Sequence, residues 1–542
     1  MPYRDDTPLR DYDLPSFEDG YNSFGSSKLL IKDTEVAPPS LNTSFDENGA
    51  AKKRAGKTRY GAEVASGHAI FGLGRLKNSS HNKVICASNT RWYLLTSSTT
   101  TQLTGTAFTA DKPTRFCQAI DRLYGANNTD NLAYTTDGAA TTHVTANGNI
   151  GDWPVYFNQR LYMTNSTFAD RIYYSNSYSI SLANPPTLTT TDFGSFETDL
   201  SSSPKKTAGF IILLPGGGVE ITGLRTDNIQ GTDYLFASTK NHGTWRIGVA
   251  TANADGSIAH TVVQFVPAGN SPSGLSIGKH KNDAWLYGED NFSTLGEVAQ
   301  YTTARVTSKG GRVKAESDSI PAAGKDDVAF ASFKDKAYFA YTTGSYNDRV
   351  IVYNSILNAW DTPYTNWNIS CFLVHTEDDG TRRLLGGSSN SADSYVHELE
   401  VGTNDQGAAI SSIFYTKSTD CKRPGLTKRF AFIDVFYGSL YGTLTYEVFI
   451  DEVSSVTGSL QIGNSATRTV GISAFPLGTK PLGAEYVANT QAELAQNDSF
   501  RIDCGYAAGK RIGVVFSNAN TSESFKINGI KISFIEGSPY EP

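Results

Sequence analysis

The sequence has 542 residues and a formal net charge of −7, with 19% charged and 11% aromatic residues. At roughly 150 residues per domain, or up to about 250 for an all-β domain, this length predicts two or three domains. No basic excess dominates, so the composition gives no case for a protein that grips nucleic acid. Glycine occurs 50 times, and Thr, Ser and Asn separate short apolar runs. This composition is typical of many short strands joined by turns.

The cysteines are odd in number and widely spaced, and none has the spacing of a metal site. They are Cys86, Cys117, Cys371, Cys421 and Cys504. We therefore expect buried thiols in a reducing compartment and no disulfide framework. The first residues show no signal-peptide pattern, and no apolar run is long enough to cross a bilayer. These features predict synthesis in a cytoplasm and no membrane insertion.

Residues 1–60 show little strand pattern, and they contain the pair Pro38-Pro39 and a basic cluster, Lys52, Lys53 and Arg54. We expect an extended N-terminal arm that becomes ordered on a partner surface. The three cations are candidate assembly contacts that dock on an acidic patch of that partner. The alternative is a solvated turn that merely precedes the next domain.

Residues 61–400 carry a recurring strand with an aromatic or aliphatic–aromatic pair, followed by a second strand after a polar turn. The marker residues are Trp92, Tyr124, Tyr162, Tyr234, Trp285 and Tyr338. An all-strand repeat of this kind predicts an irregular β-propeller of six or seven blades. Stacked sheets without closure are the alternative. The 72-residue step from Tyr162 to Tyr234 suggests a degenerate copy between them.

Residues 401–542 contain longer strands in which apolar and polar residues alternate. This alternation buries one face of a sheet and exposes the other. About eight such strands over this length predict a jelly-roll-like C-terminal β-sandwich. The predicted strands are 412–417, 429–436, 442–450, 510–516 and 525–534. The fold class is therefore all-β, and no amphipathic helix longer than two turns is expected.

Motifs for chemistry are lacking. The eight histidines form no HExxH, and neither Cys-x-x-Cys nor G-x-S-x-G occurs. The acidic pair Asp326-Asp327 and the run Glu377–Gly380 are interpreted as solvated turns, the second as a hairpin turn between 372–374 and 382–385. A glycosidase needs two carboxylates that face one cleft. We expect no catalytic residue, no cofactor and no metal.

Several segments form a pattern in chain order. Phe17-Glu-Asp-Gly20-Tyr-Asn22 is followed by Ile31-Lys-Asp33-Thr-Glu35-Val-Ala37, by Leu41-Asn42, by Gly49 and by Lys53-Arg54-Ala55-Gly56. This order resembles the opening of tail proteins of tailed bacteriophages, with Ala55 where proline is common. Asn347–Tyr353 followed by Trp360 is similar to a late blade of that family. Tyr415–Lys417 with Lys428–Phe430 is similar to its entry into the C-terminal sandwich.

The resemblance implies a propeller-bearing tail protein of the nozzle or hub type, located in the virion tail and made in the host bacterial cytoplasm. Such proteins form a ring, commonly a homo-hexamer, below the head-to-tail adaptor, and they carry fibres or spikes. DNA leaves through the ring without sequence-specific binding, and a neutral or acidic channel would let it slide. Two alternatives remain open. One is a receptor- or glycan-binding tail-tip protein that binds through 401–542, and the other is a glycan hydrolase on a propeller.

Overall fold

The computed structural model describes residues 8–24, 31–144, 150–164, 167–175, 209–214, 218–229, 231–249, 251–252, 258–288, 291–297, 306–438, 442–462 and 498–537. Parts of the predicted arm (1–7) and of the predicted sandwich (463–497) therefore lie outside the described residues. The chain divides into two compact units. One unit contains 57–351 and 365–399, and the other contains 1–56, 352–364 and 400–542.

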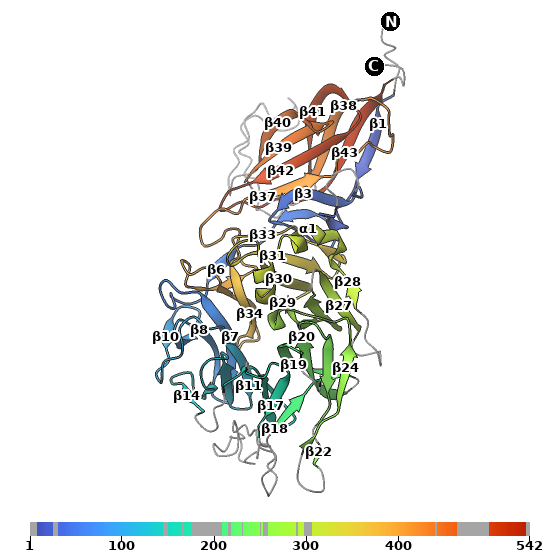
Figure 1. The fold of residues 1–542 in the computed structure, drawn as a ribbon. Helices are drawn as coiled ribbons and strands as arrows, with labels where there is room; N and C mark the ends of the chain where they lie inside the picture. Colours follow the sequence, from blue (N-terminus) through green and yellow to red (C-terminus); the bar gives the residue numbers. More distant parts are fainter. Residues whose placement is uncertain are drawn as a thin grey trace. The chain divides into compact units, whose positions relative to one another are not determined.

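Between residues 57 and 399 the described residues form seven antiparallel sheets, most of them with four strands (Figure 1). In chain order the first three are β7 (Ile70–Lys77), β8 (Asn82–Ser88), β9 (Arg91–Leu95) and β10 (Thr100–Gln102); β11 (Arg115–Ala119), β12 (Arg122–Ala126), β13 (Ala133–Thr135) and β14 (Thr142–His143); and β15 (Asp152–Phe157), β16 (Arg160–Thr164), β17 (Arg171–Tyr174) and β18 (Gly209–Ile212).

The next two sheets are β19 (Ile221–Ile229), β20 (Thr232–Thr239), β21 (Thr244–Ile247) and β24 (Val262–Val266); and β25 (Gly278–His280), β26 (Asp283–Tyr287), β27 (Phe292–Glu297) and β28 (Thr307–Ser308). The last two are β29 (Ala329–Phe333), β30 (Lys336–Thr342), β31 (Asn347–Asn354), β32 (Ala359–Trp360) and β33 (Tyr364–Thr365); and β34 (Ile369–Thr376), β35 (Arg382–Ser388), β36 (Val396–Leu399) and β6 (Lys57–Arg59). A small hairpin, β22 (Thr251–Ala252) with β23 (Ile258–Ala259), projects from the fourth sheet.

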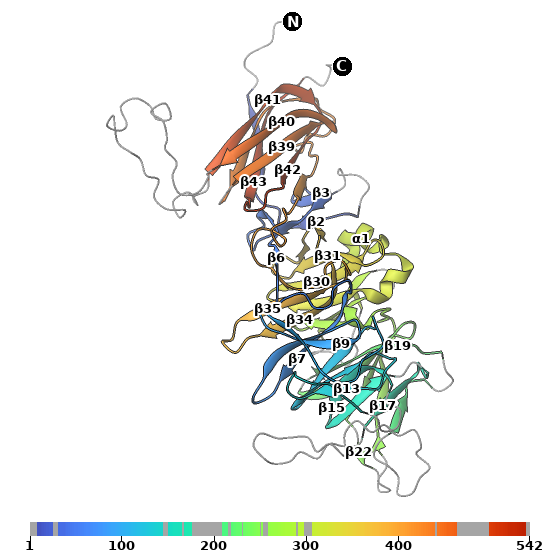
Figure 2. The ribbon, with the colours of Figure 1, turned by 90° about the vertical axis from the view of Figure 1, so that its left-hand side faces the viewer.

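The first strand of each sheet lies against the first strand of the next, or against the segment that leads into it, and β34 returns to contact β7. The ring is closed by strand β6 at the start of this unit, which pairs with β36 at its end through Lys57↔Leu399 and Arg59↔His397. The unit is a β-propeller, which confirms the predicted fold class (Figure 2). Because the ring is closed, the first strand of every sheet is covered by a neighbouring sheet.

Close approach between neighbouring blades explains the glycine in the first strands. A Cβ atom at Gly72 would lie 2.1 Å from the carbonyl oxygen of Thr114 in the link to the next sheet, and one at Gly278 would lie 2.2 Å from the Phe330 ring. Glycine is therefore required where one blade packs directly on the next.

The aromatic repeat marks the second strand in five of the sheets, at Tyr124, Tyr162, Tyr234, Trp285 and Tyr338. All of these side chains except Tyr234 are at most 2% exposed. Trp92 is the exception, because it lies on β9, the third strand of its sheet. The predicted degenerate copy between Tyr162 and Tyr234 is not among the described strands. Strands β16 and β20, which carry these residues, belong to sheets that contact each other, and residues 176–208, between β17 and β18, lie outside the described residues.

Helical structure in the described residues is short. It comprises α1 (Lys314–Asp318) and the 3-10 turns η2 (Gly274–Ser276), η3 (Gly310–Val313) and η4 (Ala322–Asp327). The acidic pair Asp326-Asp327 lies at the end of η4.

The second unit is a sandwich of two six-stranded sheets. Seven strands come from the C-terminal region: β37 (Ser412–Thr416), β38 (Lys428–Tyr437), β39 (Gly442–Ile450), β40 (Val453–Ile462), β41 (Asp498–Gly509), β42 (Ile512–Asn518) and β43 (Lys526–Glu536). The other five come from the N-terminal region: β1 (Arg10–Leu14), β2 (Gly20–Tyr21), β3 (Glu35–Leu41), β4 (Thr43–Phe45) and β5 (Ala51–Lys53). One sheet has the order β4-β5-β43-β38-β41 with β1 also on β43, and the other has the order β2-β3-β37-β42-β39-β40.

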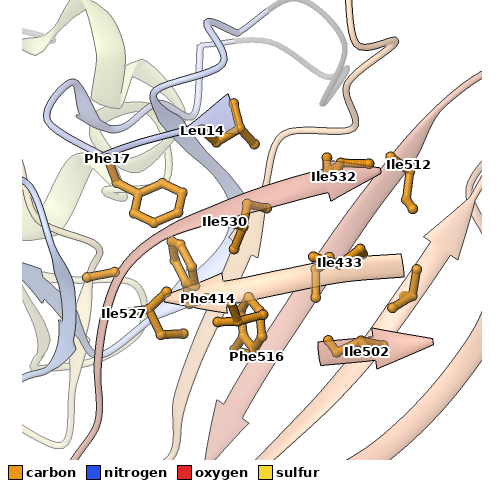
Figure 3. Packing of buried hydrophobic residues seen from close by; sticks show 14 of the residues in the cluster. Leu14, Phe17, Phe414, Ile433, Ile502, Ile512, Phe516, Ile527, Ile530 and Ile532 are labelled. Atoms are coloured by element: carbon orange, nitrogen blue, oxygen red, sulfur yellow. The ribbon is translucent and has the colours of Figure 1, made fainter. Parts of the chain in front are cut away.

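The N-terminal segment is thus part of the sandwich, which corrects the expectation of an extended arm that orders only on a partner. Strand β1 pairs with β43 along its whole length, and β3 pairs with β37. Its side chains enter the shared core, where Leu14 and Phe17 pack with residues of both sheets such as Phe414, Ile433 and Phe516 (Figure 3). Burial of these apolar side chains, at about 1.5–3 kcal/mol each, offsets the entropy of ordering the segment.

Candidate functional site

The basic cluster singled out in the sequence lies on and just after β5. Lys53 is 3% exposed. Its ammonium donates to Asn518 Oδ1 at 2.9 Å and to the carbonyl oxygens of Asn520 at 2.6 Å and Glu523 at 3.0 Å. Burial lowers the pKa of Lys53 to about 8, because removal from water disfavours the charged form. Lys53 is therefore bound inside the fold by three oxygen atoms, and its ammonium holds the loop between β42 and β43 in place.

Arg54 is also buried, and its side chain has no exposed surface. Its guanidinium donates to both carboxylate oxygens of Asp405, at 3.0 and 2.6 Å, and to Asn42 Oδ1 at 2.8 Å. The Asp405 side chain is 3% exposed. A bidentate pair of this kind fixes both the distance and the orientation of its partners, so it holds β5 to the segment that enters the C-terminal strands.

The docking hypothesis is therefore wrong for Lys53 and Arg54, since both cations are used inside their own unit. A solvated turn is wrong as well. Lys52 differs from its neighbours because it is half-buried and lies opposite Lys526 across the strand pair. Its role as an assembly contact stays a prediction.

A second buried ammonium was not found from the sequence. Lys428, at the start of β38, is fully buried and donates to the carbonyl oxygens of Arg423, Leu426 and Lys510. Burial lowers its pKa as well. In the sequence Lys428 stands beside Arg429 in a basic, polar stretch, so no local pattern distinguishes it from a surface lysine.

The acidic run at 377–380 forms the predicted hairpin turn between β34 and β35, with Gly380 at a φ of +87°. Glu377 accepts from Arg383 Nε at 3.1 Å and lies 3.3 Å from both His375 Nε2 and the Tyr60 hydroxyl. Arg383 also forms a bidentate pair with Glu398 at 2.7 Å. Arg383 therefore bridges the carboxylates of Glu377 and Glu398.

One more ionic cluster lies at the starts of strands β11 and β15 in the propeller. The Arg115 guanidinium lies 4.9 Å from the Trp153 ring centroid. Burial raises the pKa of Asp152, and the nearby Arg115 charge opposes this rise. Burial also raises the pKa of Asp327. The cluster thus holds two carboxyl groups with raised pKa values beside one arginine that stacks on an aromatic ring.

Other functional signals are sparse in the described parts of the chain. They contain no group of three or more His, Cys, Asp or Glu side chains that is suited to hold a metal ion. All five cysteines are free; four of them are buried and Cys117 is half-buried. Burial raises the pKa of Cys117, Cys421 and Cys504 to about 12. Among the described helices, none is long and apolar enough to cross a membrane.

No family model and no curated protein matches the sequence. Similar solved structures include YCF48 from Cyanidioschyzon merolae (9% identity, TM-score 0.36, covering 64% of this chain and 98% of that one). Another is BamB from Moraxella catarrhalis (8% identity, TM-score 0.32, covering 64% of this chain and 97% of that one). A third is the extracellular domain of the putative one-component system BT4673 from B. thetaiotaomicron (8% identity, TM-score 0.40, covering 77% of this chain and 57% of that one). At these identities and TM-scores the similarity carries no argument about this chain.

Proposed function

We propose that this chain is a non-catalytic structural protein of a bacteriophage tail, of the nozzle or hub type. It assembles as a ring, a homo-hexamer, below the head-to-tail adaptor, surrounds the DNA exit channel and carries fibres or spikes. The observation that supports this proposal most concerns the residues that carry the tail-protein resemblance in the N-terminal segment. Gly20, Asn42, Gly49, Arg54 and Gly56 all hold that segment within the sandwich unit.

The glycines of the motif stand at positions where the backbone needs them. Gly20 has a φ of +68°, and a Cβ there would lie 2.5 Å from the Trp360 carbonyl oxygen. Gly49 has a φ of +77° in the turn between β4 and β5, and a Cβ at Gly56 would lie 1.9 Å from the Asn404 carbonyl oxygen. A side chain at any of these positions would displace the segment from its sandwich.

The polar residues of the motif bind one another. Asn42 is buried with a φ of 55°. It accepts from Arg54 through both its side chain and its backbone carbonyl, and its amide donates to the Ser411 carbonyl oxygen at 2.7 Å. Asn22 donates to Glu35 at 2.9 Å. These hydrogen bonds hold the N-terminal segment to the strands of the sandwich. A protein that transmits load in a tail requires such a rigid attachment.

The test uses the full-length chain, alone and with the head-to-tail adaptor of the same phage, measured by mass photometry and negative-stain microscopy. We expect closed rings of six copies, on the adaptor if not alone, and the chain should be present in purified virions. Absence from virions together with no ring on the adaptor would refute the tail role. Release of reducing ends from bacterial polysaccharides would refute the non-catalytic part and favour the hydrolase alternative.

A further inference from the structure

The strand pair that closes the propeller, β6 with β36, contains a buried ionic cluster. In this pair His397 lies opposite Arg59, and Leu399 lies opposite Lys57. Strand β6 has three residues and pairs only with β36 among the described strands. The propeller unit begins at Lys57, so the chain enters the propeller through its closing strand. Few backbone hydrogen bonds hold this strand, and the side chains around it therefore decide how firmly the ring is closed.

One carboxylate joins the two strands. Asp393 precedes β36, and its Oδ2 atom lies 2.9 Å from His397 Nε2 and 3.7 Å from Lys57 Nζ. The His397 side chain has no exposed surface, and the Lys57 side chain is 6% exposed. The Arg59 guanidinium lies 3.9 Å from the Tyr395 ring centroid, so a second cation is held beside the same pair. Because a buried charge needs a partner, Asp393 binds a group from each strand.

The charges in this cluster keep His397 neutral. Burial lowers the pKa of His397, and the charges of Lys57 and Arg59 lower it further, while the hydrogen bond to Asp393 opposes them. Burial alone would raise the pKa of Asp393, but the His397 hydrogen bond and the same two cations lower it below its ordinary value of 3.8. At neutral pH the closed pair therefore contains an ionised Asp393 and a neutral His397. A proton on His397 would add a third positive charge beside Lys57 and Arg59.

The other charged groups of this sheet bind one another. Glu398 follows His397 in β36 and so points to the opposite face of the strand. It forms the bidentate pair with Arg383 of β35 at 2.7 Å. Arg383 also binds Glu377, which lies 3.3 Å from His375 Nε2 of β34. Protonation of His397 is therefore governed by Asp393 and by the cations at β6.

We propose that this cluster is an acid-sensitive latch, which lets β6 leave β36 in mildly acidic solution and so opens the propeller at its closing sheet. When β6 leaves, Lys57 and Arg59 move away and water reaches His397, so its pKa returns toward the ordinary value of 6.5. Below pH 6.5 the open form therefore binds one more proton than the closed form, and acid favours it by up to about tenfold per pH unit. Above that pH neither form protonates His397, and the latch stays closed. The inference concerns the propeller unit alone and does not depend on the proposed tail role.

The experiment follows hydrogen exchange by mass spectrometry in the full-length chain between about pH 7.5 and about pH 4.5. After correction for the intrinsic pH dependence of exchange, opening of β6 and β36 should increase by about 3–10-fold per pH unit below the ordinary pKa of histidine. His397→Gln keeps a polar side chain that takes up no proton, so this increase should disappear. His280→Gln is the matched control, since His280 is also buried, at 2% exposed, but lies on β25. It should leave the exchange of β6 and β36 as in the parent chain.

Lys57→Met separates the latch from general acid unfolding and leaves the His397–Asp393 contact in place. Without this cation His397 takes up a proton more readily in the closed form, so the increase in opening per pH unit should become smaller. The same pH dependence of β6 and β36 exchange in the parent and His397→Gln chains would overturn the proposal. The same dependence in the parent and Lys57→Met chains would overturn it as well, as would acid-induced exchange that appears in all seven sheets at once.

Discussion

Replacement of Arg54 by methionine tests whether the motif cation is an internal fastener or a partner contact. The Arg54 side chain is fully buried against a carboxylate that is 3% exposed. Removal of one member of a buried pair leaves an uncompensated charge and typically costs about 3–5 kcal/mol. The sandwich unit has about 210 residues, for which 1 kcal/mol corresponds to about 2–4 °C. We therefore expect its melting transition to fall by about 6–20 °C in the isolated chain.

Calorimetry with hydrogen exchange monitored by mass spectrometry is the suitable assay, since the two units need separate probes. Faster exchange should be confined to sandwich strands such as β5, β37 and β42, with the propeller strands unchanged. Adding Asp405→Asn to Arg54→Met removes the unpaired charge and should recover part of the loss. Lys52→Met, on the same strand but half-buried, is the control and should change stability by less than about 0.5 kcal/mol. A loss below about 1 kcal/mol in Arg54→Met, or no recovery in the double variant, would refute this reasoning.

Three further predictions concern pH, blade packing and thiol reactivity. Burial lowers the pKa of Lys53 to about 8 from an ordinary value of 10.5, so between these two pH values the unfolded chain binds more protons than the folded chain, and the free energy of unfolding should rise as the pH increases from 8 to 10.5. Urea unfolding across this range should show a smaller rise in the Lys53→Met variant. An identical dependence of stability on pH in the two chains would contradict the lowered pKa of Lys53. The Gly72→Ala substitution places a Cβ atom 2.1 Å from a backbone carbonyl oxygen, so calorimetry should show a lower melting temperature for the propeller. The Gly344→Ala substitution has open space around its Cβ atom and should have little effect. Equal effects of the two substitutions would count against blade packing as the cause. Since burial raises the thiol pKa values, Ellman's reagent at pH 8 should label the native chain far more slowly than the urea-unfolded chain. Rapid labelling of the four buried thiols, Cys86, Cys371, Cys421 and Cys504, in the native chain would be inconsistent with their burial.

Local sequence patterns predicted much of the sandwich. Strand β39 has the predicted bounds, Gly442–Ile450, because alternation of apolar and polar residues reports which side of a strand faces a core. The turn at 377–380 was also predicted, since a short acidic run that ends in glycine suits a tight hairpin. In the propeller the aromatic marker identified the second strand of most sheets. It failed at Trp92, because strand β8 of that sheet has Val84, Ile85 and Cys86 at the corresponding place and no aromatic side chain.

The sequence by itself determined that the chain is all-β, with a repeated array followed by a sandwich, because strand periodicity and turn chemistry are local properties. Only the tertiary structure decided which strands pair. Asp11 lies opposite Ser533, and Arg59 closes the propeller opposite His397. These pairings, like the burial of Lys53 and Arg54, join residues tens to hundreds of positions apart. A strand edge offers the same backbone groups to every candidate partner, so its choice depends on the packing of the whole unit and not on the neighbouring residues in the chain.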